Sequence, residues 1–406
     1  MTPQDLLSAT AVRERAGRML ALGEAGGLSH FTVDLARLDA AADYVIAVMR
    51  ENYPDLDIPF HARWRHFEAG GIDRWAEICA ARQFASAAEA GRAAFDLAIV
   101  SVLLDAGAGP DWSYEEAATG KTFSRSEGLG VASLAMFISG LFSNNAADPL
   151  RADAAALAGV SLEEIASGFQ VDGANPMVGL EGRAGLLNRL GQVVSANADV
   201  FAMEDDPRPG GLFDDLAAKA VDGVLPATAI LEAVLQTLGP IWPGRTVLEG
   251  VDLGDCWPYP GLVTDDVTTG LVPFHKLSQW LSYSLIEPLE WCGITVTDVD
   301  GLTGLPEYRN GGLFLDLDVI ALKDPADAER SHTVDSALVV EWRALTVALL
   351  DRIAEVIRRK LGETSESLPL ARVLEGGTWS AGRKIARAKR PGGGPPIMVE
   401  SDGTVF

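Results

Sequence analysis

Lys276 and Glu307 are the two side chains of this sequence whose types and spacing point most directly to a reaction. Lys276 lies in residues 273–281, which have the pattern of an amphipathic helix, and Glu307 opens a glycine-rich segment beside Tyr308 and Arg309. A lysine can bind a phosphate, and a carboxylate can stabilise the positive charge that develops on a sugar as its glycosidic bond breaks. The pair therefore suits hydrolysis of a nucleotide-like N-glycosidic bond.

The helix pattern around Lys276 also predicts further binding residues. Lys276, Gln279, Tyr283 and Glu287 fall on one polar stripe at helical spacing, beside an apolar face that contains Trp280. A solvated helix face would give the same stripe, and a turn with a surface ion pair would account for the glycine-rich acidic segment. Both alternatives stay open on the local sequence alone.

A second group of candidates gathers histidines, arginines and aromatic residues between residues 58 and 74. Such a cationic, aromatic patch suits recognition of phosphate or carboxamide groups, and an imidazole can donate a proton near neutral pH. A metal site is disfavoured because the two histidines are five residues apart and no cysteine pair accompanies them. The alternative is a set of arginine–carboxylate bridges around core aromatic residues. The candidates are His61, Arg63, Trp64, Arg65 and His66.

Composition narrows the class of protein. The chain has 406 residues, 48% of them hydrophobic, which is ample for a full core. Its formal net charge of -24 disfavours a nucleic-acid backbone or an anionic membrane as partner, but it permits a small phosphorylated ligand. Cys79, Cys256 and Cys292 form no C-x-x-C pair and are expected to be reduced. With no signal peptide and no membrane-length apolar run, we expect a cytoplasmic protein.

Helical periodicity dominates the chain, so the predicted fold class is mainly α, with minor β ribbons at 245–249 and 314–322. We expect one large helical domain over residues 1–390. A Gly/Pro-rich C-terminal tail follows over 391–406, beginning with a flexible link at 391–396. Helices are predicted at about 35–49, 86–106, 126–143, 161–168, 180–197, 212–222, 227–238, 274–290 and 334–361.

Four short segments carry a resemblance to a known family: residues 30–34, 53–56, 64–67 (Trp-Arg-His-Phe) and 69–71 (Ala-Gly-Gly). Over most of its length the chain resembles a bacterial and fungal uracil-catabolism family, whose pathway degrades uracil through a ribosylurea intermediate. The resemblance implies a pathway rather than a mechanism. It also implies a functional link to the GTP-cyclohydrolase-II-like enzyme of that pathway.

The order Lys276, Gln279, Glu307, Tyr308, Arg309 is similar to a pattern in the queuosine-salvage N-glycosidases. There, Lys-x-x-Gln precedes Asp-Tyr-Arg, the Asp is the catalytic carboxylate, and a nucleotide 5′-monophosphate is cleaved into base and ribose phosphate. This sequence departs at one position, because Glu307 stands where the pattern has Asp. The extra methylene keeps the acid chemistry but changes its reach, so a different leaving group is compatible with the pattern.

The same similarity has implications for the fold. The queuosine-salvage enzymes are helical and related in architecture to DNA glycosylases, so it implies a DNA-glycosylase-like arrangement for residues 1–390. A DNA glycosylase proper is disfavoured by the acidic charge. Arg183, near the start of an amphipathic helix, matches an arginine of that family, and either points into a cleft or caps a neighbouring element.

The expected reaction is hydrolysis of ribosylurea 5′-phosphate to urea and ribose 5-phosphate. Glu307 would stabilise the oxocarbenium-like transition state and position water, Lys276 would hold the phosphate with help from Arg309, and His61 or His66 would protonate the leaving urea. No cofactor or metal is required by this chemistry.

Two other functions remain open. One is an amide or ring-opening hydrolase acting on a uracil nucleotide of the same pathway. The other is a non-catalytic nucleotide-binding partner of the cyclohydrolase-like enzyme. The sequence does not fix the oligomeric state, and a homodimer is held only as a hypothesis.

Overall fold

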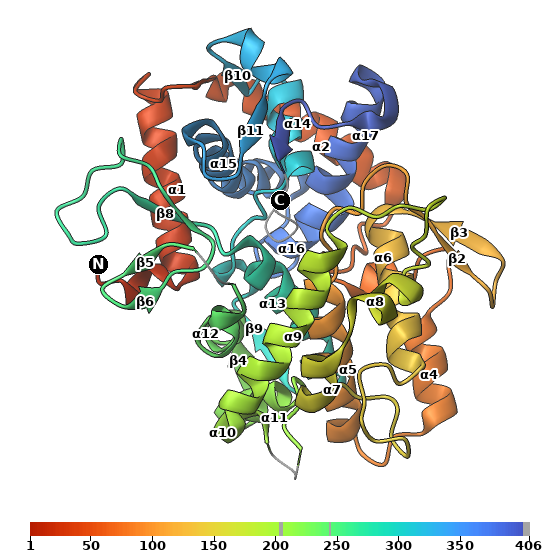
Figure 1. Ribbon diagram of the computed structural model, residues 1–406. Helices are drawn as coiled ribbons and strands as arrows, with labels where there is room; N and C mark the ends of the chain where they lie inside the picture. The colour runs from red at the N-terminus through yellow and green to blue at the C-terminus, as the bar shows by residue number, and fades with distance from the viewer. Residues whose placement is uncertain (203–205, 243–244, 401–406) are drawn as a thin grey trace.

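Helices form most of the protein (Figure 1). The computed structural model describes residues 1–202, 206–242 and 245–400. These form one mainly α domain, which confirms the predicted fold class, whereas the likeness to DNA glycosylases stays a prediction. The longer helices are α1 (Ala9–Glu24), α2 (Leu38–Asn52), α5 (Ala87–Leu103), α6 (Arg125–Ile138), α9 (Leu180–Ala196), α12 (Ala227–Leu238), α13 (Lys276–Trp291) and α15 (Ala337–Leu361).

Shorter helices connect and cover the longer ones. Each predicted helical range overlaps a helix of the structure. The shorter helices are α3 (Trp64–Phe67), α4 (Arg74–Arg82), α7 (Ala154–Gly159), α8 (Leu162–Gly168), α10 (Ala198–Phe201), α11 (Gly211–Lys219), α14 (Tyr308–Asp316), α16 (Leu370–Arg372) and α17 (Ser380–Lys389). A π-helical turn, η6 (Val373–Trp379), joins α16 to α17. Such turns are uncommon and are often found at functional sites.

The long helix α15 occupies the core and packs against α1, α2 and α14. Ser336 caps its first turn by accepting a hydrogen bond from the Val339 backbone N–H at 3.4 Å. Gly362 ends it in a left-handed conformation with φ of 75°, which glycine adopts without steric cost. Its side chains are buried around most of the circumference, as expected of a helix inside a core rather than on a surface.

Strands occur only as short ribbons in the described part of the chain. The predicted ribbon at 245–249 is confirmed in part, because Val247–Leu248 pairs with Val251–Asp252. The ribbon predicted over 314–322 is wrong in its first half, which continues helix α14 to Asp316. The pairs are β1 (Phe31–Val33) with β10 (Ile320–Leu322), β2 (Tyr114–Glu116) with β3 (Lys121–Phe123), β4 (Val224–Pro226) with β9 (Thr295–Thr297), β5 (Val247–Leu248) with β6 (Val251–Asp252), β7 (Cys256–Pro258) with β8 (Leu271–Pro273), and β11 (Ser331–Thr333) with β12 (Met398–Glu400).

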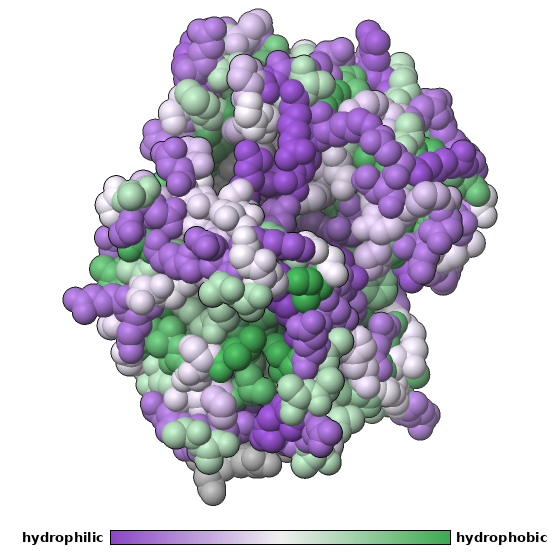
Figure 2. Space-filling view, turned by 90° about the vertical axis from the view of Figure 1, so that its right-hand side faces the viewer, coloured by the Kyte–Doolittle hydropathy of each residue, from purple (hydrophilic) through white to green (hydrophobic). Residues whose placement is uncertain are grey.

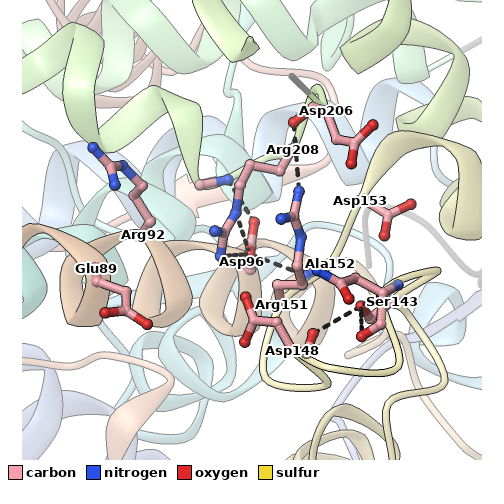
Figure 3. A network of polar contacts seen from close by, with 12 residues as sticks. Glu89, Arg92, Asp96, Ser143, Asp148, Arg151, Ala152, Asp153, Asp206 and Arg208 are labelled. Carbon is pink, nitrogen blue, oxygen red and sulfur yellow. Dashed lines mark hydrogen bonds and ion pairs between the residues drawn. The ribbon is translucent and has the colours of Figure 1, made fainter. Parts of the chain in front are cut away.

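A buried ion pair joins α5 to the segments that flank α7 and α11 (Figure 3). Asp96 is fully buried on α5, and one of its carboxylate oxygens accepts hydrogen bonds from the Arg208 guanidinium and the Ala152 backbone N–H. The other oxygen accepts from the Gly210 backbone N–H at 2.6 Å. Each carboxylate oxygen therefore has partners, and the pair fixes two loops to the helix. These residues are called the Asp96 cluster below.

The surface carries both hydrophilic and hydrophobic areas. On the face that Figure 2 shows, hydrophilic side chains cover most of the upper half and hydrophobic side chains gather in the lower half. Among the described residues, no helix combines the length and the apolar character that crossing a membrane would need.

Candidate active site

A cavity of about 380 Å³ lies where segments far apart in the sequence meet. Its walls come from the segment around α3, the loop after α5, the starts of α6, α13 and α14, the end of η6, and the C-terminal residues 393–399. Helix ends and loops thus supply the polar groups, while the helix bodies form the core behind them. The structure brings six of the predicted site residues to this cavity: His61, His66, Lys276, Glu307, Tyr308 and Arg309.

Lys276 begins α13 and is fixed there by its neighbours. The residue before it, His275, has a φ of 49°, an uncommon left-handed conformation for a residue with a side chain, and its ring Nε2 donates to the Leu6 carbonyl at 2.8 Å. The Lys276 backbone N–H donates to Asp255, whose carboxylate also forms a two-bond pair with Arg343. Burial and repulsion by Arg343 lower the pKa of the Lys276 amine.

Glu307 is the N-cap of α14, and both of its carboxylate oxygens are engaged by that helix. One oxygen accepts from the Arg309 backbone N–H and the other from the Asn310 backbone N–H, each at 2.7 Å. These two hydrogen bonds fix the position of the carboxylate at the first turn of α14. Glu307 therefore presents an oriented carboxylate on the cavity wall.

Arginine and aromatic side chains lie next to this carboxylate. The Arg309 guanidinium lies 4.5 Å from the ring centre of Trp379 and 5.0 Å from that of Tyr308. Arg309 is 9% exposed, and its guanidinium forms no hydrogen bond with the described residues. Trp280 contributes a further aromatic wall. The cavity thus combines flat apolar surfaces with a positive charge whose donors are available to a ligand.

His61 is paired with a carboxylate that the sequence analysis did not identify. Its ring Nδ1 lies 2.6 Å from the Glu375 carboxylate on η6, and both side chains are largely buried. A carboxylate at Nδ1 holds the proton on that nitrogen and leaves Nε2 for a ligand. The His61 ring also lies 5.7 Å from Trp379, centre to centre. This geometry orients the imidazole at the cavity wall.

His66 is held differently. Its Nδ1 lies 3.3 Å from the Arg63 guanidinium, which also donates to the Asp105 carboxylate at 2.7 Å. Burial and then the positive charge of Arg63 lower the pKa of His66 well below its ordinary value. His66 is accordingly neutral at physiological pH, which makes His61 the better placed of the two predicted proton donors.

The structure places the remaining residues of the second group away from the cavity wall. Arg63 is fully buried behind it, bound to Ser101 and Asp105, and so supports His66. Trp64 donates its indole N–H to the Ser284 carbonyl and lines a separate, mainly apolar cavity of about 320 Å³. Arg65 binds Glu287 at 2.8 Å. The predicted substrate-binding positions Arg63, Trp64 and Arg65 are thus not brought to the cavity.

Only part of the polar stripe predicted on α13 faces the cavity. Gln279 and Tyr283 are buried, and both bind the backbone of Thr303: its N–H donates to the Gln279 side chain, and its carbonyl accepts from the Tyr283 hydroxyl. They hold the segment before Glu307 against α13 instead of lining the cavity. Helical spacing places residues on one side of a helix, but it does not show whether a neighbouring segment covers that side.

Arg183 supports the cavity from outside. It is fully buried and donates to the carbonyl groups of Leu104, Ala106 and Val178. Ala106 lies on the cavity wall, so Arg183 fixes the loop after α5. Burial lowers the pKa of Arg183 to about 10. Of the two predicted placements, the structure favours capping a neighbouring element.

Several cavity residues were missed by sequence reasoning. Asp105 lies in an ordinary loop, and Trp280 was assigned to the apolar face of its helix. Arg125 is a single arginine outside any motif, and no sequence pattern predicts its φ of 57°. Trp379 lines the cavity from the end of η6, and Glu375 on the same turn reaches the site only through its contact with His61.

The C-terminal residues close one side of the cavity. Gly393, Gly394 and Pro395 line it, and Met398–Glu400 pairs in parallel with β11. The expected flexible link is therefore part of the wall, held by a two-bond ion pair from Arg390 to Asp316. Residues 401–406 of the predicted tail lie outside the described residues. Across the described ranges, no group of three or more histidine, cysteine or acidic side chains could hold a metal ion.

Comparison with known proteins gives matches over the whole chain. A family model described as "Protein of unknown function (DUF1688)" matches residues 5–406. The chain is 40% identical over 413 residues to "Protein urg3" of Schizosaccharomyces pombe, covering 100% of this chain and 99% of that protein. It is 38% identical over 412 residues to "Uracil catabolism protein 4" of Lachancea kluyveri, covering 93% and 92%. These matches confirm the predicted resemblance to a uracil-catabolism family.

Proposed function

The chain belongs to the DUF1688 family, and with that membership as premise we propose that it acts in uracil catabolism by hydrolysing the N-ribosyl bond of a ring-opened uracil nucleotide. The substrate that fits best is ribosylurea 5′-phosphate, which with one water gives urea and ribose 5-phosphate. The name of the relative from Lachancea kluyveri supports the pathway, and the cavity supports the reaction class.

The observation that carries the proposal is the meeting of Glu307, Lys276, Arg309 and His61 on one aromatic-walled cavity. These residues come from distant segments, so their meeting does not follow from their sequence spacing. A cavity of about 380 Å³ lies within the range usual for small-molecule sites. Fixed negative charge, positive charge and a proton donor are the groups that glycosidic cleavage of a phosphorylated riboside requires.

Glu307 would act on the sugar. Its carboxylate is held in place by two backbone N–H groups, so it need not reorganise as positive charge develops at the anomeric carbon. A carboxylate on this face can also accept a proton from the attacking water. The departing bond is the one between the anomeric carbon and the urea nitrogen, and the bond that replaces it joins that carbon to the water oxygen.

His61 would protonate the leaving urea nitrogen. Urea leaves poorly as an anion, so a proton must reach the nitrogen as the bond breaks. The Glu375 carboxylate at Nδ1 orients the imidazole and directs Nε2 away from itself. Glu375 is thus a positioning residue. His61 gives one proton to urea, Glu307 takes one from the attacking water, and exchange with solvent restores both groups.

The test is a mass-spectrometric time course with ribosylurea 5′-phosphate, using wild type, Glu307→Gln and Glu307→Asp. Glutamine keeps one capping oxygen but loses the charge, so we expect a loss of at least about 100-fold in rate with a loss of about 1 kcal/mol in stability. Aspartate is itself a favoured N-cap and keeps the charge, so it should retain stability and part of the activity.

Equal turnover by wild type and Glu307→Gln would contradict the proposed role of Glu307. A product that still carries its ribose, formed by wild type from a uracil nucleotide, would instead establish the amide or ring-opening hydrolase. Binding without turnover would favour the nucleotide-binding partner.

A further inference from the structure

Arginine side chains from three elements gather beside the cavity: Arg125 and Arg309 line it, and Arg383 lines a small neighbouring hollow together with Arg309. Arg125 begins α6, Arg309 lies in α14, and Arg383 and Arg387 lie one turn apart on α17. Arg309 and Arg383 both face the ring of Trp379, at 4.5 and 5.4 Å from its centre. These four arginines are called the arginine subsite.

The C-terminal segment connects the other two arginines to the same place. Arg125 donates to the Gly392 carbonyl at 3.2 Å, and Gly393 lies directly against the Arg387 side chain. Arg125 and Gly393 both line the cavity. The subsite therefore lies where the C-terminal segment crosses the starts of α6 and α14.

Positive charge is in excess there. Among the described residues, the one carboxylate paired with any of the four arginines is Glu127, which binds Arg383 at 2.7 Å. Repulsion by Arg383, and more weakly by Arg125 and Arg309, lowers the pKa of Arg387. In a chain of net charge -24, such a gathering of like charge opposes folding unless an anion offsets it.

Two features bring the arginines together at a structural cost. A Cβ on Gly382 would lie 2.2 Å from the Arg309 carbonyl oxygen, so only glycine lets α17 approach α14 this closely. Arg125 has a φ of 57°, a left-handed conformation that costs a residue with a side chain about 1–2 kcal/mol. Strain of this kind gathers at ligand sites.

Some N–H donors of the arginine subsite have no hydrogen-bond partner among the described residues. Arg309 is more than nine-tenths buried and its guanidinium forms no hydrogen bond with the described residues, although it lies on the cavity wall. The Nε atom of Arg383 is buried without a hydrogen-bond partner in the same part of the chain. Buried donors left open in this way fit an acceptor that is supplied by a ligand.

We propose that the arginine subsite binds the phosphate of a phosphomonoester, and so selects a phosphorylated riboside over the free riboside. A phosphate presents several acceptor oxygens and a double negative charge, which matches planar guanidinium donors. The identity of the rest of the ligand rests on the proposed function. Lys276, which lies near the opposing charges of Glu307 and Asp105, is then left for the reacting part of the substrate.

The experiment measures binding of ribose 5-phosphate and of ribose by calorimetry to wild type, Arg387→Gln, Arg125→Gln/Arg387→Gln and Lys276→Gln. Arg387 is exposed, so its single variant should fold. Arg18→Gln is the matched control, because Arg18 is an exposed arginine bound to Glu14 on α1. The thermal midpoint of each protein without ligand shows whether it is folded.

We expect wild type and Arg18→Gln to bind ribose 5-phosphate but not ribose. The double variant should bind it at least tenfold more weakly, and Arg387→Gln should lie between. The affinity should also fall as salt is raised. Unchanged affinity in the double variant, equal binding of ribose, or loss confined to Lys276→Gln would overturn the subsite.

The subsite and the proposed function can fail separately. Arginine-dependent binding of ribose 5-phosphate without cleavage of ribosylurea 5′-phosphate would keep the subsite and reject the reaction. Cleavage of phosphorylated and unphosphorylated ribosylurea with the same kcat/KM, unaffected by the double variant, would keep the reaction and reject the subsite.

Discussion

Two groups of charged side chains in this protein use arginine in opposite ways. In the Asp96 cluster, the buried carboxylate accepts from Arg208, Ala152 and Gly210, so each of its oxygens has a partner within the chain (Figure 3). At the cavity, Arg309 is almost as deeply buried, yet its guanidinium forms no hydrogen bond with the described residues. The first arrangement is complete without a ligand, and the second is not.

The difference shows how to separate a structural charge from one that is available for binding. Depth of burial does not distinguish them, because Asp96, Arg183 and Arg309 are all buried. What distinguishes them is whether the chain itself supplies the partners. By that criterion Arg183, whose donors reach three carbonyl groups, belongs with Asp96. Each experiment below tests one side of the comparison.

The largest effect is expected from Asp96→Asn. The change leaves Arg208 buried without its counter-charge and should lower the free energy of unfolding by about 3–5 kcal/mol. Thermal and urea unfolding would measure it. Asp215→Asn is the control, because Asp215 pairs with the half-exposed Lys219 and should cost less than about 1 kcal/mol. A loss as small as that of the control would mean that the Asp96 cluster does not stabilise the fold.

Glu375→Gln should act on the reaction instead of on the fold. Without the carboxylate at Nδ1, the His61 imidazole is less well oriented, so kcat should fall about 10–100-fold. The thermal midpoint should stay near that of wild type, whereas a purely structural role would lower it. Affinity for ribose 5-phosphate should stay at the wild-type level.

His66 gives a pH dependence of stability whose sign follows from its surroundings. Burial and then Arg63, His61, Arg309 and Arg383 lower its pKa below the ordinary 6.5, so the unfolded chain takes up a proton in acid that the folded chain does not. Below about pH 6.5 the free energy of unfolding should therefore fall by up to about 1.4 kcal/mol per pH unit from this group.

His66→Gln removes that contribution while its side-chain oxygen can still accept from Arg63. Thermal midpoints at about pH 7.5 and about pH 5.5 should show a smaller acid loss in the variant than in wild type. An identical acid loss in both proteins would show that His66 titrates normally in the folded state.

The smallest effect is expected from Arg125→Gly. Glycine adopts the left-handed conformation freely but makes the unfolded chain more flexible, so stability should rise by no more than about 1 kcal/mol. Affinity for ribose 5-phosphate should fall, as in Arg125→Gln, which keeps the strain. A loss of stability in the glycine variant would show that Arg125 is needed by the fold and not only by a ligand.

The sequence predicted most of the longer helices because apolar periodicity and capping residues are local, but it missed α1. Gly362 after a basic turn marked the end of α15 correctly, and the pairing of Lys276 with Glu307 rested on the order and spacing of a motif. The side of a helix that faces the cavity was less predictable. Gln279 and Tyr283 share a helix side with Lys276, but the segment at Thr303 covers them.

The contributions from distant segments could not be predicted at all. Glu375 meets His61 across 314 positions of sequence, and the arginine subsite depends on the close approach of α17 to α14 at Gly382. A Gly/Pro-rich stretch such as residues 391–396 has the composition of a flexible link. It forms a wall here because Arg390 and the β11–β12 pair hold its two sides.

The cavity wall formed by residues 393–399 determines when, during synthesis, the cavity can be complete. The cavity includes both His61 and Val399, and Val399 is made long after His61. A ribosome-bound chain can build α1, α2 and α5 long before the wall at 393–399 emerges, so a stalled or truncated product would retain much of its helical content and still lack a closed cavity. A stop codon within residues 393–399 should therefore abolish function even though the longer helices precede it.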